Sequence, residues 1–409
     1  MQPLRLTLVT TSYPVCPGSS SGIFVARMLD SLGDSVVTTV VTPSASCAEE
    51  HPAGRHALRL FRYAPRSWER LAHSPGGIPV ALRTQPMLRS LVPPFLLSMT
   101  YAAWRQATNS DALHANWAIC GCAAGLAGRL RGKPVVTTLR GEDVTRGLGS
   151  RSGRAVLKCA LSLSAAVVTV SDFMREMVGN RWPRWAHKVV TIPNGVDERF
   201  LALGRNHVPW DASRPLEMAT VGSLIPRKGI EELLTAVAEV HVPKGFRLTV
   251  AGDGPERADL EARSKALGLG DQVRFLGAVE ADRVHDLMRT SDLFLLASRS
   301  EGRPNVVLEA MASGLPVVAS DIAGVRELIT HGVDGLLYPV GQPAKLSRAI
   351  ETLAREPDRV AEMGARAHRS VIDRRLLWER TGEDYLSLYR SLLERQVSQS
   401  DRHRNAAQH

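Results

Sequence analysis

Two glutamates eight residues apart, Glu301 and Glu309, stand before and inside one predicted helix. Eight residues of helix span ~12 Å at ~1.5 Å per residue. That distance exceeds the ~5–9.5 Å between the two carboxylates of a glycosidase, so we do not expect an acid/base pair. Two binding roles fit better, with Glu301 accepting hydrogen bonds from sugar hydroxyls and Glu309 accepting from both hydroxyls of a ribose. The alternatives are structural: Glu301 as a turn carboxylate that the helix dipole favours, and Glu309 as the partner of an arginine.

The start of this helix is itself suited to bind an anion. Pro304 can occupy the first turn, where its missing N–H costs nothing. The amides of Asn305, Val306 and Val307 then have no acceptor within the helix and lie at the positive end of its dipole. We therefore expect these three residues to hold a diphosphate.

The elements that must position these residues follow from short β-branched runs that alternate with helical patterns. Strands are expected over 6–10, 36–42, 134–139, 166–170 and 189–192, and again over 217–221, 248–251, 273–276, 293–297 and 316–319. Strand and helix alternating in this way imply parallel sheets with helices on both faces. Two series of similar length imply an α/β fold of two doubly wound domains facing across a cleft.

The domain boundary is expected where periodicity lapses, within 197–215. This predicts a first domain over 1–200 and a second over 201–375. A helix over 376–397 is expected to pack back toward the first domain, and 398–409 to form a disordered tail. Ligands of such folds bind where the carboxyl ends of the strands face the cleft, and we expect the chemistry there.

Composition narrows the class of partner. The chain has 51 basic and 41 acidic residues, a formal charge of +10, and only seven lysines among the basic residues. This excess favours phosphates on a substrate or an acidic membrane surface as partners, although genome base composition could also produce it. Aromatic residues make up 5% of the chain, which argues against a nucleic-acid reader built on stacking. The five cysteines show no common zinc-site spacing, so no zinc site is expected from them.

Membrane contact is a narrower question. The first apolar run is too short for a signal peptide and no stretch approaches the ~18 apolar residues that span a bilayer, so we expect a cytoplasmic protein that is at most peripheral on a membrane. The apolar segment 82–107 carries arginines and a Pro-Pro pair. It is expected to be a helix pair covering the first sheet. The alternative is a lipid-contacting surface in which Phe95, Leu96 and Trp104 enter the interface.

One long motif resembles a known family. The string E-G-x-P-N-x-x-L-E-A-M-A-x-G-x-P-V, over 301–317, resembles the signature of retaining glycosyltransferases of the family-4 type, which have two Rossmann-like domains in the GT-B arrangement. Further segments that resemble the family lie at 19–32, 111–117, 138–144, 192–197, 221–237, 250–260 and 320–339. The resemblance implies hexosyl transfer from a nucleotide diphosphate sugar to a saccharide or lipid-linked acceptor in bacterial polysaccharide or surface glycan synthesis. It also implies retention at the anomeric carbon, with neither a metal nor another cofactor.

The resemblance also implies residue roles. Lys228 matches the lysine that neutralises the departing diphosphate, where a fixed cation lowers the barrier because charge develops in the transition state. Arg227 adjoins it, and Gly254 lies in the next turn of the same binding region. Gly22 would let the backbone approach the diphosphate, and His114 matches the histidine that contacts the donor sugar. The alternatives are an exposed helix-start lysine, an ordinary turn glycine and a core histidine.

Three positions depart from the family pattern. Ser223 stands where many members carry an arginine, and Asn116 where a histidine is frequent. Arg140-Gly141 replaces the common His-Gly. Arg140 could supply the missing charge to a phosphate or select an anionic acceptor.

Competing functions are weaker. Gly252-Asp253-Gly254 begins like a dinucleotide-binding fingerprint, but Arg257 occupies the place of the third small residue, so an oxidoreductase is not favoured. A nucleotide-sugar isomerase of the 2-epimerase type would keep the same nucleotide site and stays the main alternative. An inactive nucleotide-sugar binder is kept open by Ser223. No residue is an evident covalent nucleophile, so a front-face substitution is expected.

Overall fold

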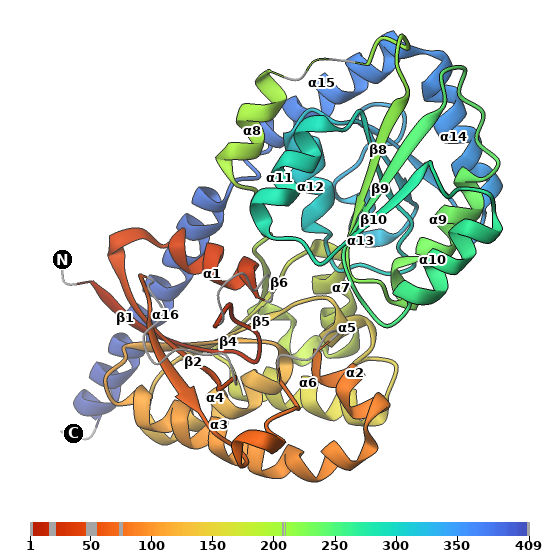
Figure 1. Ribbon diagram of the computed structural model, residues 1–409. Coiled ribbons are helices and arrows are strands. Elements are labelled where there is room, and N and C mark those ends of the chain that lie inside the picture. The colour runs from red at the N-terminus through yellow and green to blue at the C-terminus, as the bar shows by residue number, and fades with distance from the viewer. Residues whose placement is uncertain are drawn as a thin grey trace. The chain divides into compact units, whose positions relative to one another are not determined.

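The chain folds into two compact units, each built on one parallel sheet (Figure 1). The computed structural model describes residues 3–15, 22–45, 55–72, 77–206, 208 and 210–406, of which 79–80 and 399–406 are described by their backbone alone. The first unit comprises Met1–Pro193 with Trp378–His409, and the second comprises Asn194–Leu377. Residues 19–21 of the glycine-rich segment lie outside the described residues.

The sheet of the first unit has seven strands in the order β3-β2-β1-β4-β5-β6-β7, all paired in parallel. Its strands are β1 (Leu4–Val9), β2 (Val36–Pro43), β3 (Ala57–Phe61), β4 (Ala112–Asn116), β5 (Val135–Leu139), β6 (Ala166–Thr169) and β7 (Val189–Thr191). Its helices are α1 (Ile23–Asp30), α2 (Gly77–Thr84), α3 (Val92–Ala107), α4 (Ala118–Arg131), α5 (Glu142–Thr145), α6 (Arg151–Leu163), α7 (Asp172–Arg181) and α16 (Trp378–Ala406).

Helices cover both faces of this sheet because the strands alternate apolar side chains between the two sides. Leu6 and Leu8 pack with α1 and α16, whereas Leu113 and Ala115 pack with α3 and α4. In Figure 1, α3 and α4 are the orange helices on one side of the sheet. The alternation along β4 therefore directs His114 and Asn116 away from α3 and α4, to the face on which α16 packs.

The second unit repeats the design with six strands in the order β10-β9-β8-β11-β12-β13. Its strands are β8 (Leu216–Val221), β9 (Phe246–Ala251), β10 (Val273–Gly277), β11 (Leu293–Leu296), β12 (Val317–Ser320) and β13 (Gly335–Tyr338). Its helices are α8 (Glu198–Arg205), α9 (Ile230–Val237), α10 (Arg257–Ala266), α11 (Ala281–Thr290), α12 (Asn305–Ala312), α13 (Ala323–Arg326), α14 (Pro343–Arg355) and α15 (Pro357–Asp373). Leu293 and Leu295 face α9 and α14, and Phe294 and Leu296 face α8 and α12.

Each sheet has a point at which the strand order reverses direction. It lies between β1 and β4 in the first unit and between β8 and β11 in the second. At such a point the loops leaving the two neighbouring strands diverge to opposite faces and open a crevice at the carboxyl ends, where doubly wound folds bind ligands. The doubly wound α/β architecture predicted for each half of the chain is confirmed.

The structure differs from the predicted elements at several places. Strands β3, β4 and β13 were not foreseen, and α8 lies in the stretch where periodicity seemed to lapse; it belongs to the second unit because Phe200 and Leu201 are buried there. The first unit accordingly ends at Pro193 rather than at residue 200. Helix α16 continues to Ala406, past the tail predicted from residue 398, since no proline or glycine interrupts that stretch.

The segment 82–107 also differs in detail. The Pro-Pro pair does not break a helix pair but lies in the first turn of α3, where proline is tolerated. Phe95 is buried in the core beneath this helix, so it is not available to a membrane. Among the residues that the structure describes, no helix is both long and apolar enough to cross a bilayer.

Candidate active site

The reversal point of the second sheet brings together two loops that carry predicted site residues. The loop after β8 ends in a 3₁₀ turn over Pro226–Lys228, and the loop after β11 holds Glu301. Because β8 and β11 are neighbours in a parallel register, both loops leave the same edge of the sheet. A lysine and a glutamate 73 residues apart thus meet at the place where this fold binds ligands.

Backbone contacts hold the two loops together. Gly229 adopts φ +65°, and a Cβ atom at this position would lie 2.1 Å from the carbonyl oxygen of Ala297. Only glycine allows both this left-handed conformation and this close approach. The N–H of Arg299 also donates to the carbonyl of Arg227 at 2.8 Å. Lys228 is therefore held beside the loop of Glu301 by the backbone, not only by its own side chain.

Three ionised side chains meet between these loops. Lys228 Nζ lies 2.6 Å from Glu301 Oε1, and Arg227 Nη1 lies 3.2 Å from Glu301 Oε2. Ser298 donates to Glu301 Oε1 at 2.8 Å, and Arg227 also donates to the carbonyl of Ser300 at 2.7 Å. The side chains of Glu301, Lys228 and Arg227 are 10%, 17% and 28% exposed. The cluster is nearly enclosed and carries one positive charge in excess.

The charge state of Glu301 follows from two opposing effects. Burial alone would raise the pKa of this carboxyl group. The charges of Lys228 and Arg227, with hydrogen bonds from Lys228 and Ser298, outweigh burial and hold the pKa of Glu301 below its ordinary value. Glu301 is therefore an ionised hydrogen-bond acceptor at neutral pH, and no proton is available from it for acid catalysis.

Helix α12 begins four residues after Glu301, as the sequence predicts, with Pro304 at its N-cap. The amides of Asn305 and Val306 are at the helix start, where no intrahelical acceptor exists. The amide of Val307 already bonds to the carbonyl of Pro304 at 3.2 Å. Glu309 stands one turn after Asn305, on the same side of the helix, and is 8% exposed.

Gly254 and Gly22 both have structural reasons to be glycine. A Cβ on Gly254 would lie 2.3 Å from the carbonyl oxygen of Leu224, so this glycine lets the loop after β9 pack on the loop after β8. Gly22 is the N-cap of α1 with φ +73°, and a Cβ there would lie 2.4 Å from the carbonyl oxygen of Ser12. Their predicted contacts with the donor stay predictions.

His114 lies in the interior of the first unit, on β4. Its Nδ1 is 2.6 Å from the hydroxyl of Tyr389 and its Nε2 is 2.8 Å from the hydroxyl of Thr138. Thr138 is also 2.9 Å from the hydroxyl of Tyr385. Burial, with the charge of Arg140 adding to it, lowers the pKa of His114 to about 3. This is the arrangement of a neutral core histidine, and the sugar contact predicted for it stays a prediction.

Sequence reasoning missed two residues that hold the site in place. Ser298, three residues before Glu301, orients its carboxylate. Asn194 donates from Nδ2 to Asn305 Oδ1 at 3.0 Å and fixes the first side chain of α12. Asn194 lies in the segment 192–197, which resembles the family, and that was the signal that could have found it.

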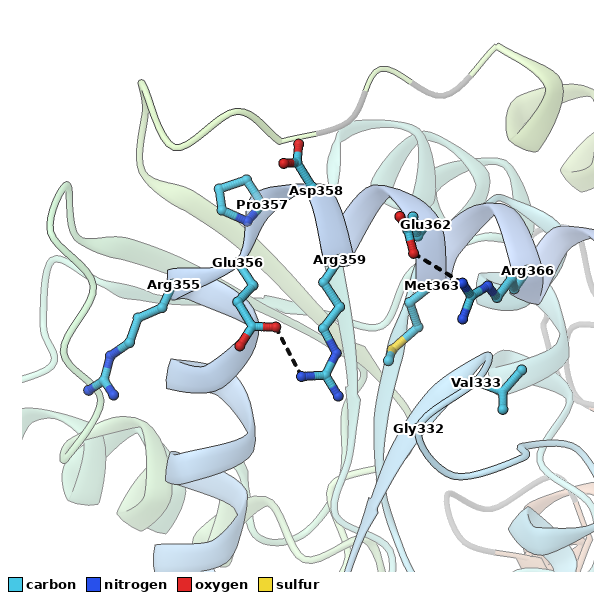
Figure 2. Close-up of a pocket in the computed structure, with 10 residues that line it drawn as sticks. All are labelled: Gly332, Val333, Arg355, Glu356, Pro357, Asp358, Arg359, Glu362, Met363 and Arg366. Carbon is cyan, nitrogen blue, oxygen red and sulfur yellow. Dashed lines mark hydrogen bonds and ion pairs between the residues drawn. The ribbon is translucent and has the colours of Figure 1, made fainter.

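The pocket of about 570 Å³ in Figure 2 is a different feature of the second unit. It lies where α14 meets α15, and its lining includes Gly332 and Val333, which precede β13. This is the amino edge of the sheet, opposite to the loops of Lys228 and Glu301. Its three arginines are already paired: Arg359 with Glu356 and Arg366 with Glu362, each at 3.0 Å, and Arg355 with Glu351 at 3.3 Å. The pocket therefore plays no part in the candidate site.

The described residues contain no group of three or more His, Cys, Asp or Glu side chains that could hold a metal ion. The positive charge of the side chains at the candidate site comes from Lys228 and Arg227.

Comparison with known proteins gives the same assignment for both halves of the chain. Residues 210–370 match the family "Glycosyl transferases group 1", and residues 25–200 match "Glycosyltransferase Family 4". N-acetyl-alpha-D-glucosaminyl L-malate synthase of Bacillus anthracis is 28% identical over 74% of this chain and 80% of its own length. The lipopolysaccharide core biosynthesis glycosyltransferase LpsE of Rhizobium meliloti is 30% identical over 46% of this chain, which spans 54% of that relative.

Solved structures share the fold. The crystal structure of Anabaena Alr3699/HepE in complex with UDP and glucose has a TM-score of 0.74 at 20% identity, covering 95% of this chain and all of that one. Sucrose-phosphate synthase from Thermosynechococcus elongatus has a TM-score of 0.75 at 21% identity, covering 96% and 99%. None of the proteins named here is an isomerase, so the isomerase alternative has no support. The chain has two doubly wound units, an ion cluster at the reversal point of the second sheet, and a match to a glycosyltransferase family in each half. It is therefore a glycosyltransferase of the family-4 type with the GT-B fold.

Proposed function

We propose that this chain transfers a hexose from a nucleotide diphosphate sugar to a saccharide or lipid-linked acceptor, with retention at the anomeric carbon and without a metal ion. The observation that carries the proposal is the meeting of Lys228 and Arg227 on Glu301, four residues before α12 begins. Two cations and a helix start are groups that a departing diphosphate requires.

The pairing of Lys228 with Glu301 suggests how the site changes when a donor binds. The diphosphate would compete for the hydrogens of Lys228 and Arg227, because its charge is larger than that of one carboxylate. Glu301 would then be free to accept from a sugar hydroxyl while Ser298 keeps it oriented. In the ligand-free state Glu301 thus compensates the cations that later stabilise the leaving group.

Arg227 can compensate for Ser223, the position at which this chain departs from the family pattern. Many family members carry an arginine at that position, and here the guanidinium of Arg227 reaches the same carboxylate as Lys228. We propose that Arg227 supplies the second cation. With both charges in place no divalent ion is needed to neutralise the diphosphate, and the leaving phosphate oxygen can take the acceptor proton in a front-face substitution.

The relatives support the choice of substrates. Structures of HepE contain UDP and glucose, and LpsE acts in lipopolysaccharide core biosynthesis. A uridine diphosphate sugar as donor and a bacterial surface saccharide as acceptor are therefore our first candidates for this chain.

The proposal is tested by calorimetric titration of the whole chain with UDP, GDP and ADP, in EDTA and again with Mg²⁺. We expect one diphosphate to bind in EDTA with an affinity that Mg²⁺ leaves within about threefold. Slow hydrolysis of the matching sugar nucleotide, followed by NMR, should first release the anomer that the donor carried. Absence of diphosphate binding would refute the proposal. Strict dependence on Mg²⁺ would refute metal independence, and release of the opposite anomer would refute retention.

Peripheral association with a membrane is a second part of the proposal, and it concerns one surface of the first unit. This surface, the α3–α4 face, exposes Leu97 (72%), Tyr101 (59%) and Leu130 (65%). Two arginines lie beside this surface: Arg105 is 6.0 Å from the ring centre of Tyr101, and Arg131 lies over the ring of Trp104 at 3.9 Å and donates to the backbone carbonyl of Trp104, which joins α3 to α4. Between residues 70 and 141 the chain contains a single acidic residue, Asp111. Apolar side chains within an almost purely basic field suit an anionic lipid surface.

Sedimentation with vesicles tests this surface. We expect binding to vesicles of phosphatidylcholine with phosphatidylglycerol, and little binding to phosphatidylcholine alone. The pair Leu97→Asp and Tyr101→Asp should abolish binding, whereas Val397→Asp, an exposed apolar position on α16, should not. Equal binding by all three proteins would rule out the α3–α4 face as the contact.

A further inference from the structure

A group of polar side chains at the reversal point of the first sheet has no part in the mechanism above. Asn116 ends β4, Trp117 is the N-cap of α4, and Arg140 follows β5. Arg140 Nε donates to Asn116 Oδ1 at 2.8 Å. The guanidinium carbon of Arg140 lies 4.9 Å from the ring centre of Phe24, and that ring meets the ring of Trp117 edge to face at 6.3 Å. These four residues form one contiguous cluster, which we call the Arg140 cluster.

Two hydrogen-bond donors of the Arg140 cluster are buried without an acceptor. They are Asn116 Nδ2 and Trp117 Nε1. The bond from Arg140 occupies Asn116 Oδ1, so the amide orientation is determined and Nδ2 must be the free end. Asn116 is 0% exposed, and a buried donor without a partner is costly unless a ligand or water satisfies it. Unsatisfied donors of this kind call for an acceptor.

The charge of Arg140 indicates which kind of acceptor the two donors would bind. Arg140 places a guanidinium in the interior, where burial lowers its pKa. The nearby carboxylate of Asp143 is already used by two backbone amides, those of Ala118 at 3.1 Å and of Arg140 at 2.9 Å. A positive charge beside two free N–H donors favours an anionic oxygen over a neutral one.

The starts of two helices, α1 and α4, add positive charge to the Arg140 cluster. Trp117 stands directly before α4, and Phe24 lies in the first turn of α1, so both helices begin at the Arg140 cluster. Helix starts carry partial positive charge. Trp117 also has φ +79°, a conformation that a bulky residue adopts only where its surroundings hold it, and such positions concentrate at ligand sites.

We propose that Asn116, Trp117 and Arg140 form a subsite for a carboxylate or phosphate group of a substrate, separate from the diphosphate of the donor. The proposal rests on the proposed function only in taking the anion from a sugar donor or its acceptor. Two sources fit the chemistry: a carboxylate on the transferred sugar, or a phosphate or carboxylate on the acceptor.

Calorimetric titration with matched probes distinguishes these sources. The donor pair is UDP-glucuronate against UDP-glucose, and the acceptor pair is glycerol 3-phosphate against glycerol at saturating UDP. We expect the anionic member of one pair to bind about tenfold or more tightly than its neutral counterpart, the range that charge-assisted hydrogen bonds supply. The pair that shows this preference identifies the source.

Asn116→Asp is the decisive variant. It keeps the oxygen that accepts from Arg140 Nε, so the fold should persist, but it replaces the free donor by a negative charge. The preference for the anionic probe should disappear while the affinity for UDP alone stays within about twofold. Trp117→Phe removes the indole N–H and keeps a smaller aromatic ring at this position, so it should reduce the preference by about threefold to tenfold. Arg146→Ala, an exposed arginine one turn beyond Glu142, is the control and should change nothing.

Three results would overturn the subsite. The first is equal binding of anionic and neutral members in both pairs. The second is a preference that survives in Asn116→Asp and in Trp117→Phe. The third is a parallel loss of UDP binding in these variants, which would assign the residues to the diphosphate. The proposed function is judged separately, because UDP binding by the wild-type chain does not depend on any of these outcomes.

Discussion

The ion cluster around Glu301 and the network around His114 occupy opposite kinds of environment, although resemblance to one family predicts donor contacts for both. The side chains of Glu301, Lys228 and Arg227 are 10–28% exposed and lie on loops that follow strands. His114 is 0% exposed, lies within β4, and has both ring nitrogens bonded to hydroxyl groups of Tyr389 and Thr138. The first region is charged and partly exposed, and the second is neutral and fully enclosed.

This difference indicates that the availability of a side chain to a ligand depends on whether it lies within a strand or beyond the end of that strand. A residue beyond the carboxyl end of a strand can exchange one partner for a ligand, as we propose for Lys228 and Glu301. A residue inside a strand of a sheet covered on both faces is held by its neighbours. We therefore expect the cluster around Glu301 to carry the chemistry and the network around His114 to contribute to stability, while the contact of His114 with the donor sugar stays a prediction.

Replacing Lys228 by alanine should have the largest effect, and it tests the role of the charged region around Glu301. We expect turnover to fall about 10²–10³-fold, the usual loss when one preorganised transition-state contact is removed, in a chain that is still folded at the assay temperature. Steady-state kinetics measure it, and the exposed Lys244→Ala is the matched control. Turnover like that of the control would show that Lys228 does not stabilise the leaving group.

The pH dependence of the free energy of unfolding tests the enclosed network around His114. The pKa of His114 is about 3 in the fold and near 6.5 when unfolded, so below pH 6.5 the unfolded chain binds a proton that the folded chain does not. Stability is therefore lost as pH falls. The free energy of unfolding of the wild type, relative to His114→Gln, should drop by about 2 kcal/mol from pH 7 to pH 5. A flat difference across this range in urea titrations would mean an ordinary, accessible histidine.

Glu309 should separate binding from turnover within the charged region. It is enclosed one turn beyond Asn305, where it is proposed to accept from a ribose. Glu309→Gln should weaken donor binding about tenfold, because one charge-assisted acceptor is lost, and should leave turnover at saturating donor nearly unchanged. Reduced turnover with intact donor affinity would contradict a ribose contact.

Arg227 should give the smallest effect. It is the most exposed member of the cluster, and its contact with Glu301 is longer than that of Lys228. We expect Arg227→Ala to reduce turnover about fivefold, and Ser223→Arg in that background to restore part of it, since a cation would return to the family position. Failure of Ser223→Arg to restore any activity would argue that Arg227 does not replace the missing arginine.

The sequence by itself was sufficient for the architecture of each half and for the helix start at Asn305. Alternating apolar runs and the position of Pro304 are features of short stretches of sequence, so they can be recognised before the tertiary structure is known. The single motif over 301–317 likewise carried the resemblance that the family matches confirm.

Only the tertiary structure decided which charges meet. Lys228 and Glu301 are 73 residues apart, and the pairing of β8 with β11 places them together. The same holds for His114 and Tyr389, which are 275 residues apart and whose side chains meet in the interior of the first unit. Such contacts arise because a sheet orders its strands differently from the chain, and no local pattern of residues records that order.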